Sequence, residues 1–384
     1  MNFKLINVAI LSVLVMASCS KDEVVSNADT SSQNAISFNA LGSKAQTKAT
    51  PITSANLTTT DFDVFAYTAD GTAFMGKVDV DFAHDGVKIK YSTAENKWVY
   101  DKPEELAYWP AVDNPLDFYA VSPSVSLTGH EAMHYMWNFN HDNQLIYYNV
   151  LDEYNAAITD SDMHANHDVM YGIAKAQTKN TNNGTVKFTF KHILSQIVFK
   201  ARTELTNMKA TVKSIKIQNA KMSGTFKLPN DVSTDATAAN WTLPTGDLAY
   251  YNPTVVMDKS IEVTSNETAV DISSTTPLFV IPQALTKWVV SGGTKSKHDA
   301  DIAKQSYLII DCKLEQNGIT LHDGSLYVPF GDSWEPGRRY IYTLIFGGGY
   351  DHEGDPILKP IEFDAEVTEW VDATNDINTS VGGL

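Results

Sequence analysis

Apolar residues in this chain alternate with polar residues at a period of two, or gather in short apolar runs, over many segments. These segments lie at 36–40, 62–67, 87–91, 98–100, 116–122, 169–174, 186–190, 197–199, 215–217, 225–228, 277–282, 307–314, 340–346 and 361–367. Each has the length of a β-strand, and turn residues such as Asp70-Gly71 separate them. A helical period of useful length is absent from the pattern. The sequence therefore predicts an all-β protein built from β-sandwiches.

The spacing of these segments predicts two tandem domains. A length of 384 residues suggests two domains, and the polar stretch 175–184 (KAQTKNTNNG) is the clearest linker. We expect an N-terminal sandwich domain at 49–184 and a C-terminal sandwich domain at 185–384. Residues 127–168, rich in histidine and aromatic residues, form a long excursion from the first domain, and 143–157 is compatible with a helix.

The first 18 residues have the order of a secretion signal. Lys4 is followed by an apolar run at 5–16, then by small residues directly before Cys19. This order resembles a bacterial lipoprotein signal, which predicts cleavage before Cys19 and attachment of lipid to its thiol. An ordinary secretory peptide, with a cysteine there by chance, is the alternative. Residues 20–23 (SKDE) resemble the export tag of surface lipoproteins of Bacteroides-type bacteria, which predicts a surface-exposed outer-membrane lipoprotein.

Residues 19–48 combine a tether with one strand. The polar stretch 20–34 predicts a disordered tether. The segment Ile36-Ser37-Phe38-Asn39-Ala40-Leu41 follows as a lone strand pattern, and small residues with Lys44 and Lys48 come next. A tether, one strand and then an exposed basic site is the arrangement expected of a strand that is later cut away.

Charge and cysteine content exclude several classes of function. The formal net charge of −17 argues against binding nucleic acid or an anionic membrane face, which need clustered cations. If Cys19 carries lipid, Cys312 is the one remaining cysteine and no disulfide forms within the chain. Cys312 lies on the apolar side of the pattern at 307–314, so we expect a buried, inert thiol.

Candidate metal and catalytic groups do not complete a known constellation. His130, His134, His164 and His167 lie near several aspartates, but no ligand set of known spacing results, and surface polar residues in a loop are the favoured interpretation. Acidic stretches at 79–86 and 351–355 lack the register of an EF-hand. We therefore expect no metal and no cofactor.

The sequence also bears on two other functions, hydrolysis and glycan binding. Ser195 is not in a G-x-S-x-G elbow, so no catalytic residue is assigned and the chain is not expected to be an enzyme. Most tryptophans of a β-sandwich are core residues. Trp137 is the exception, because it lies in the polar excursion beside Tyr135 and Phe139, and these three residues are candidate contacts for a ligand.

Seven short motifs, in order along the chain, resemble the fimbrillin family of Bacteroides-type bacteria. They are Thr47-Lys48-Ala49, Tyr108-Trp109-Pro110, 118–123 (FYAVSP), 190–195 (FKHILS), Ile281-Pro282-Gln283, 334–340 (WEPGRRY) and 367–370 (VTEW). With the lipoprotein signal, the resemblance covers nearly the whole chain. It implies a pilus subunit of two transthyretin-like β-sandwich domains, assembled outside the outer membrane.

The resemblance also implies a route of assembly. A trypsin-like surface protease cuts after a basic residue and removes the first strand, and a C-terminal strand of a neighbouring subunit takes its place. Carried onto this sequence, the cut falls after Lys48 or, as the alternative, Lys44, and 36–41 is the displaced strand. Residues 370–384 are the candidate donor, although polar stretches make them a weak strand by composition. A stalk, anchor or tip position stays open.

The function expected from the sequence is a structural subunit or adhesin of cell-surface fimbriae. Its partners would be other fimbrial subunits, bound by strand exchange, the surface protease, and a host or bacterial surface ligand. A lipid anchor would hold the chain to the outer membrane until processing transfers it to the fimbrium. The alternative is a surface lipoprotein that binds a glycan or host ligand through the excursion and does not polymerise.

Overall fold

The computed structural model describes a protein of short strands and very little helix. It covers residues 34–41, 57–78, 84–111, 114–124, 135–139, 142–149, 168–221, 223–231, 233–245, 250–251, 254–273, 278–358, 362–369 and 379–380. Strands occur at every segment where the sequence predicts one. The all-β fold class is therefore confirmed.

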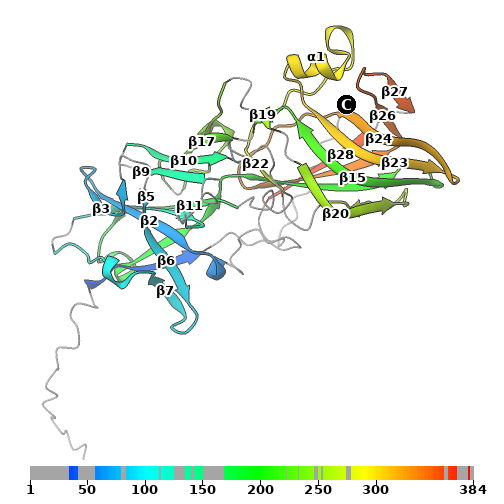
Figure 1. Ribbon diagram of the computed structural model, residues 1–384. Helices are drawn as coiled ribbons and strands as arrows, with labels where there is room; N and C mark the ends of the chain where they lie inside the picture. The colour runs from blue at the N-terminus through cyan, green and yellow to red at the C-terminus, as the bar shows by residue number, and fades with distance from the viewer. Residues whose placement is uncertain are drawn as a thin grey trace, which may run out of the picture.

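A central sheet organises the first part of the chain, at the left of Figure 1. In spatial order its strands are β13 (Lys191–His192), β11 (Met170–Gln177), β8 (Leu116–Ser122), β2 (Phe62–Thr68), β6 (Val87–Ser92) and β7 (Lys97–Tyr100), with β3 (Ala73–Met75) paired to β2. The neighbouring pairs in this sheet are antiparallel.

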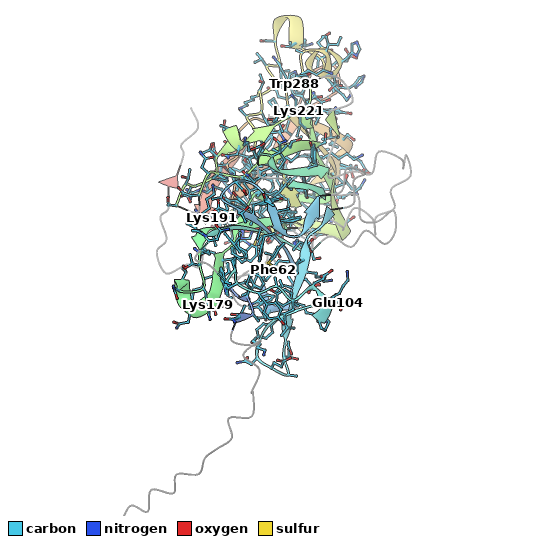
Figure 2. All side chains as sticks on the ribbon, turned by 90° about the vertical axis from the view of Figure 1, so that its left-hand side faces the viewer. Phe62, Glu104, Lys179, Lys191, Lys221 and Trp288 are labelled. Carbon is cyan, nitrogen blue, oxygen red and sulfur yellow. The ribbon has the colours of Figure 1, made fainter. Side chains whose placement is uncertain are left out.

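The central sheet is buried on both faces, and the composition of β2 explains how. Phe62 and Val64 point into one hydrophobic core, whereas Phe65 and Tyr67 point into another. Alternate side chains of a strand project to opposite faces, so a strand that is apolar at nearly every position must be covered on both sides. Figure 2 shows Phe62 inside the first of these cores.

Each face of the central sheet has its own covering layer. The parallel pair β1 (Ser37–Leu41) and β12 (Thr185–Thr189) covers the face of Phe62. The other face is covered by a sheet in the order β18 (Trp241–Thr242), β17 (Ser223–Lys227), β10 (Gln144–Asn149) and β9 (Tyr135–Phe139). A small hairpin of β4 (Lys77–Val78) and β5 (His84–Asp85) lies beside these layers.

The rest of the described chain forms a sandwich around a separate core. One sheet contains β21 (Val270–Asp271), β14 (Ser195–Thr203), β25 (Arg338–Phe346), β28 (Glu362–Glu369) and β29 (Thr379–Ser380), with β22 (Leu278–Val280) also paired to β14. The facing sheet contains β20 (Thr254–Val263), β15 (Met208–Gln218), β23 (Tyr307–Gln316), β24 (Ile319–Pro329), β26 (Gly348–Tyr350) and β27 (Pro356–Leu358). A short antiparallel pair, β16 (Ala220–Lys221) and β19 (Tyr250–Tyr251), lies between β15 and β20 in the sequence.

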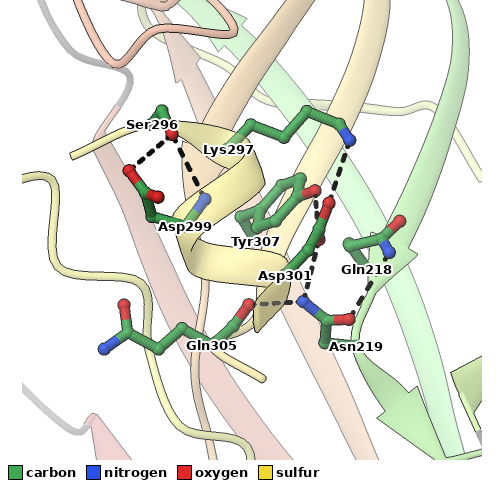
Figure 3. Close-up of polar contacts among 8 residues, drawn as sticks. All are labelled: Gln218, Asn219, Ser296, Lys297, Asp299, Asp301, Gln305 and Tyr307. Carbon is green, nitrogen blue, oxygen red and sulfur yellow. Dashed lines mark hydrogen bonds and ion pairs between the residues drawn. The ribbon is translucent and has the colours of Figure 1, made fainter. Parts of the chain in front are cut away.

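The helix α1 (Lys297–Ile302) is fixed to the end of this sandwich through Asp301 (Figure 3). The Asp301 carboxylate accepts hydrogen bonds from the Tyr307 hydroxyl at 2.7 Å and the Asn219 amide at 3.1 Å, and pairs with Lys297 at 3.0 Å. Burial, with Asp301 beside it, raises the pKa of Tyr307. Short 3-10 helices occur at Leu57–Thr59, Pro103–Glu105, Thr181–Gly184, Ala238–Asn240 and Gly292–Thr294.

Strand pairing crosses the predicted domain boundary at 184/185. β12 follows that boundary but pairs with β1. β17, further along the predicted second domain, pairs with β10 of the predicted excursion. The first residues of the predicted linker belong to β11. The division into two tandem domains at this position stays a prediction.

The helix considered at 143–157 is wrong for residues 144–149, which form β10. Ile146 and Tyr148 are buried and Tyr147 between them is exposed, which is the alternation of a strand. Among the described residues, helices are too short and too polar to span a membrane.

Candidate functional site

The candidate site is the position of β1 and the walls that enclose it. β1 pairs in parallel with β12, from Ser37 opposite Thr185 to Leu41 opposite Thr189. This pairing joins two parts of the chain that lie far apart in the sequence. The strand predicted at 36–41 is present, and it is seated in the first core.

Within the described part of the chain, backbone pairing on the second edge is confined to residues 34–36, directly before β1. The Ile36 amide donates to the Ala107 carbonyl, and the Trp109 amide donates to the Asn34 carbonyl, both at 2.9 Å. Ala35 bridges to Tyr108 in antiparallel register. From Ser37 to Leu41 the strand is therefore held through one edge, that of β12.

Alternation along β1 directs its apolar side chains inward. Ile36 is 1% exposed and Phe38 is 6% exposed, whereas Ser37 and Asn39 face solvent. The Ser37 hydroxyl lies 2.8 Å from that of Thr185, on the outer face. We call the space filled by the inward side chains at positions 36, 38 and 40 the β1 slot.

Aromatic rings form the walls of the β1 slot. The Phe38 ring stacks on Phe188, with centroids 6.2 Å apart and an interplanar angle of 9°. Phe118 and Tyr100 meet it at 6.3 Å and 5.7 Å in inclined orientations. Offset-stacked and edge-to-face contacts of this kind stabilise a ring beyond its area burial.

Polar contacts from the slot walls hold the backbone of β1 and its neighbours. The Tyr100 hydroxyl donates to the Ile36 carbonyl at 3.1 Å, and burial raises the pKa of Tyr100. The Trp109 indole donates to the Gly184 carbonyl at 3.0 Å. Gly184 has a φ of +77°, and a Cβ there would lie 3.2 Å from the indole nitrogen, so glycine suits both the backbone and the contact.

Several residues singled out by the sequence lie outside the described residues. These are the lipidation residue Cys19, both lysines proposed for cleavage (Lys44 and Lys48), and the histidines of the excursion. Their roles stay predictions. In the described part of the chain, no three His, Cys, Asp or Glu side chains gather as a metal site.

The candidate ligand residues Tyr135, Trp137 and Phe139 lie on β9. The register places Trp137 opposite Ile146 and Tyr135 opposite Tyr148. Both partners on β10 are buried. A ligand contact at β9 stays a prediction.

Sequence reasoning missed the polar and aromatic partners that surround β1. Tyr100, Trp109 and Phe188 lie in predicted strands or motifs. The local pattern does not link them to residues 36–41, because it carries no information on pairing between segments far apart in the sequence. It also missed a buried pair: His192 Nδ1 lies 2.7 Å from the Asp168 carboxylate. Asp168 is one of the aspartates near the histidines of the excursion, and the sequence pattern does not indicate its pairing with His192.

Comparison with known proteins places the chain among fimbrial proteins. A family model described as fimbrillin-like matches residues 47–370. The solved fimbrial protein of Bacteroides vulgatus ATCC 8482 is 16% identical, with a TM-score of 0.58 over 88% of this chain and 100% of that chain. At this identity the likeness is one of fold.

A second solved structure, the tip fimbrial protein Mfa3 of Porphyromonas gingivalis, is 11% identical, with a TM-score of 0.40 over 81% of this chain and 94% of that chain. A search of curated proteins found no match. The family model covers most of the chain, from residue 47, which follows β1, to residue 370, directly after β28. The chain therefore belongs to the fimbrillin-like family.

Proposed function

We propose that this protein is a structural subunit or adhesin of cell-surface fimbriae that is assembled by protease-activated strand exchange. It is exported as a lipoprotein through Cys19 and held at the outer membrane. A trypsin-like surface protease then cuts after Lys48 or Lys44, β1 leaves, and a strand of a neighbouring subunit takes its place. The role is structural and needs no catalytic residue.

One observation carries the proposal: β1 packs into the first core but, among the described pairings, its backbone from Ser37 to Leu41 is hydrogen-bonded along one edge. A cut between 41 and 57 would leave it joined to the rest of the protein by non-covalent contacts alone. Its departure would free the β12 edge and uncover Phe188 and Phe118. Unpaired backbone groups beside exposed apolar surface are a template for another strand.

Strand exchange of this kind would continue from one subunit to the next. Each subunit would offer one slot and one donor strand, so the contact is head-to-tail and does not close on itself. Heterologous contacts without closure build open filaments. β1 would block this reaction until proteolysis, because it occupies the slot from within the same chain.

Limited trypsin digestion of the protein beginning at residue 20 tests the proposal. We expect a cut after Lys48 or Lys44, followed by ladders on native gels and filaments in electron micrographs. The variant that combines Lys44→Gln with Lys48→Gln should stay uncut between residues 41 and 57 and should remain monomeric.

A disulfide lock separates cleavage from strand loss. Ser37 and Thr185 are register partners with hydroxyls 2.8 Å apart, so Ser37→Cys with Thr185→Cys should bridge β1 to β12. The locked protein should be cut yet remain monomeric, and reductant should release it to polymerise. Persistent monomer after β1 has been cut and has left would contradict polymerisation and favour the ligand-binding lipoprotein.

The lipid anchor is tested separately, in cells of the bacterium that produces this protein. The parent protein should fractionate with the outer membrane and incorporate labelled fatty acid. Cys19→Ala should abolish the label and release the protein. Equal labelling of the two forms would contradict the assignment of Cys19.

A further inference from the structure

The β1 slot has a different size requirement at each of its three inward positions. Position 36 holds an aliphatic side chain that is almost completely buried, and position 38 holds a buried aromatic ring. Position 40 holds the small side chain of Ala40, which packs against the same core. The order is large aliphatic, aromatic and small, at alternate residues.

Position 38 is the most demanding of the three. The ring of Phe38 has Phe188 parallel to it, and Phe118 and Tyr100 inclined against it. The Tyr100 hydroxyl donates a hydrogen bond to the Ile36 carbonyl. A side chain without a ring would leave a cavity lined by these aromatics, and cavities of this kind are costly because the walls relax only in part.

We propose that the β1 slot selects its incoming strand by an aromatic residue at the middle inward position, with an aliphatic residue two places before it and a small residue two places after. This inference rests on the proposed function, since it concerns the strand that replaces β1. The occupant is a strand of a neighbouring subunit with that pattern, running parallel to β12.

This chain contains a close match and a poor match to the pattern. Residues 361–365 read Ile-Glu-Phe-Asp-Ala and repeat the inward residues of β1, Ile-Ser-Phe-Asn-Ala. They belong largely to β28, which is paired along β25 inside its own sandwich, so they are not free to leave. They nevertheless provide a natural sequence with which to probe the slot.

The poor match is the candidate donor at the end of the chain. The one aromatic residue of 370–384 is Trp370, which has Thr368 two places before it and Asp372 two places after, in place of an aliphatic and a small residue. The best alternating stretch, 377–381, reads Ile-Asn-Thr-Ser-Val. Seated in the β1 slot, it would place Thr379 where the aromatic walls surround a ring. We therefore infer that residues 370–384 of a second copy are not the preferred occupant, and that a different strand, with an aromatic residue at the middle inward position, is.

Exchange of labelled nonapeptides into the trypsin-cut protein tests the selection. Three peptides of this chain carry isoleucine at their third position: 34–42 (NAISFNALG), 359–367 (KPIEFDAEV) and 375–383 (NDINTSVGG). We expect the first two to bind and the third to bind about a hundredfold more weakly. Phe38→Thr in the first peptide should cause a similar loss, and Thr379→Phe in the third should recover most of the affinity.

The outcomes separate this inference from the function on which it rests. Binding of all the peptides with equal affinity would leave strand exchange standing and overturn the selection. Failure of every peptide to bind, including 34–42, after β1 has left would overturn both. The disulfide-locked protein, cut but with β1 retained, should bind none of them, and binding there would show that the peptides attach elsewhere.

Discussion

Two strands of this protein, β1 and β14, each pack into a hydrophobic core and pair in parallel with one neighbouring strand. They differ in how many of their edges are hydrogen-bonded. β14 pairs with β25 from Gln196 to Thr203 and with β22 and β21 on its other edge. β1 pairs with β12 alone from Ser37 to Leu41, among the described pairings. Each strand buries a phenylalanine, Phe38 in β1 and Phe199 in β14, but Ser37 and Asn39 of β1 are exposed whereas no residue of β14 is. Under the proposed strand exchange, its single paired edge and exposed outer face are what set β1 apart from β14.

The backbone around the buried phenylalanine of each strand makes the difference concrete. The Phe199 amide donates to the Ser273 hydroxyl at 2.6 Å, and the Phe199 carbonyl accepts from the Ile272 amide at 3.0 Å. In β1 the second edge is engaged before Phe38, at residues 34–36. A strand paired on one edge loses fewer hydrogen bonds when it leaves.

The largest expected effect comes from truncating these two phenylalanines. Phe199→Ala and Phe38→Ala should each lower the free energy of unfolding by about 3–5 kcal/mol in the uncut protein, because each empties a buried aromatic site. After cleavage and loss of β1, the cost of Phe199→Ala should persist, whereas the Phe38→Ala protein should match the parent. Urea unfolding of cut and uncut forms, followed by tryptophan fluorescence, measures both. A cost of Phe38→Ala that survives the loss of β1 would contradict the comparison.

The sequence predicts the elements of both regions well, because period-two alternation is a local signal. β1 is an example: Ile36, Phe38 and Ala40 alternate with polar residues, and the structure buries the first two. β10 shows the limit of such reasoning. The sequence is compatible with a helix at 143–157, although Ile146 and Tyr148 carry the same alternation and lie in a strand.

What the sequence does not specify is pairing between distant segments. β1 pairs with β12, and β10 pairs with β17 as well as with its neighbour β9. Both β12 and β17 lie beyond the linker proposed at 175–184. Many strands of this chain have equivalent apolar faces, so the choice of partner depends on the packing of whole layers. The walls of the β1 slot could not be predicted for this reason, even though the strand itself could.

A smaller effect is expected from the hydroxyl that anchors the start of β1. Tyr100→Phe removes the hydrogen bond to the buried Ile36 carbonyl and should lower the free energy of unfolding of the uncut protein by about 1–2 kcal/mol. Tyr91→Phe is the control, since its hydroxyl bonds to Asn96 in an exposed turn and should matter less. The Tyr100→Phe protein should also release β1 faster after cleavage. Equal release from parent and variant would mean that Tyr100 does not hold the strand.

A still smaller effect is expected on the outer face of β1. Ser37→Ala removes the exposed contact with the Thr185 hydroxyl and should change the free energy of unfolding by less than about 0.5 kcal/mol. Thermal unfolding of parent and variant measures it. A loss well above this value would show that the outward residues of β1, and not only the inward ones, determine how firmly it is seated.

The reactivity of Cys312 should not change when β1 leaves. Cys312 is fully buried in the core that β14 closes, and burial raises the pKa of its thiol to about 12. Below that pH the thiolate is scarce, and alkylation requires opening of the core. In the protein beginning at residue 20, Cys312 is the one cysteine, so mass spectrometry reads its alkylation directly.

Alkylation of Cys312 by iodoacetamide at pH 8 should therefore proceed at the same slow rate before and after cleavage, whereas Phe199→Ala should accelerate it. The reagent would report opening only of the core that contains Cys312 and Phe199, because β1 packs in a different core. Acceleration on loss of β1 would mean that the two cores open together, and strand exchange at β1 would then disturb the core behind β14. An unchanged rate would mean that the protein can exchange one strand while the rest of its fold stays closed, as a subunit that must survive its own activation requires.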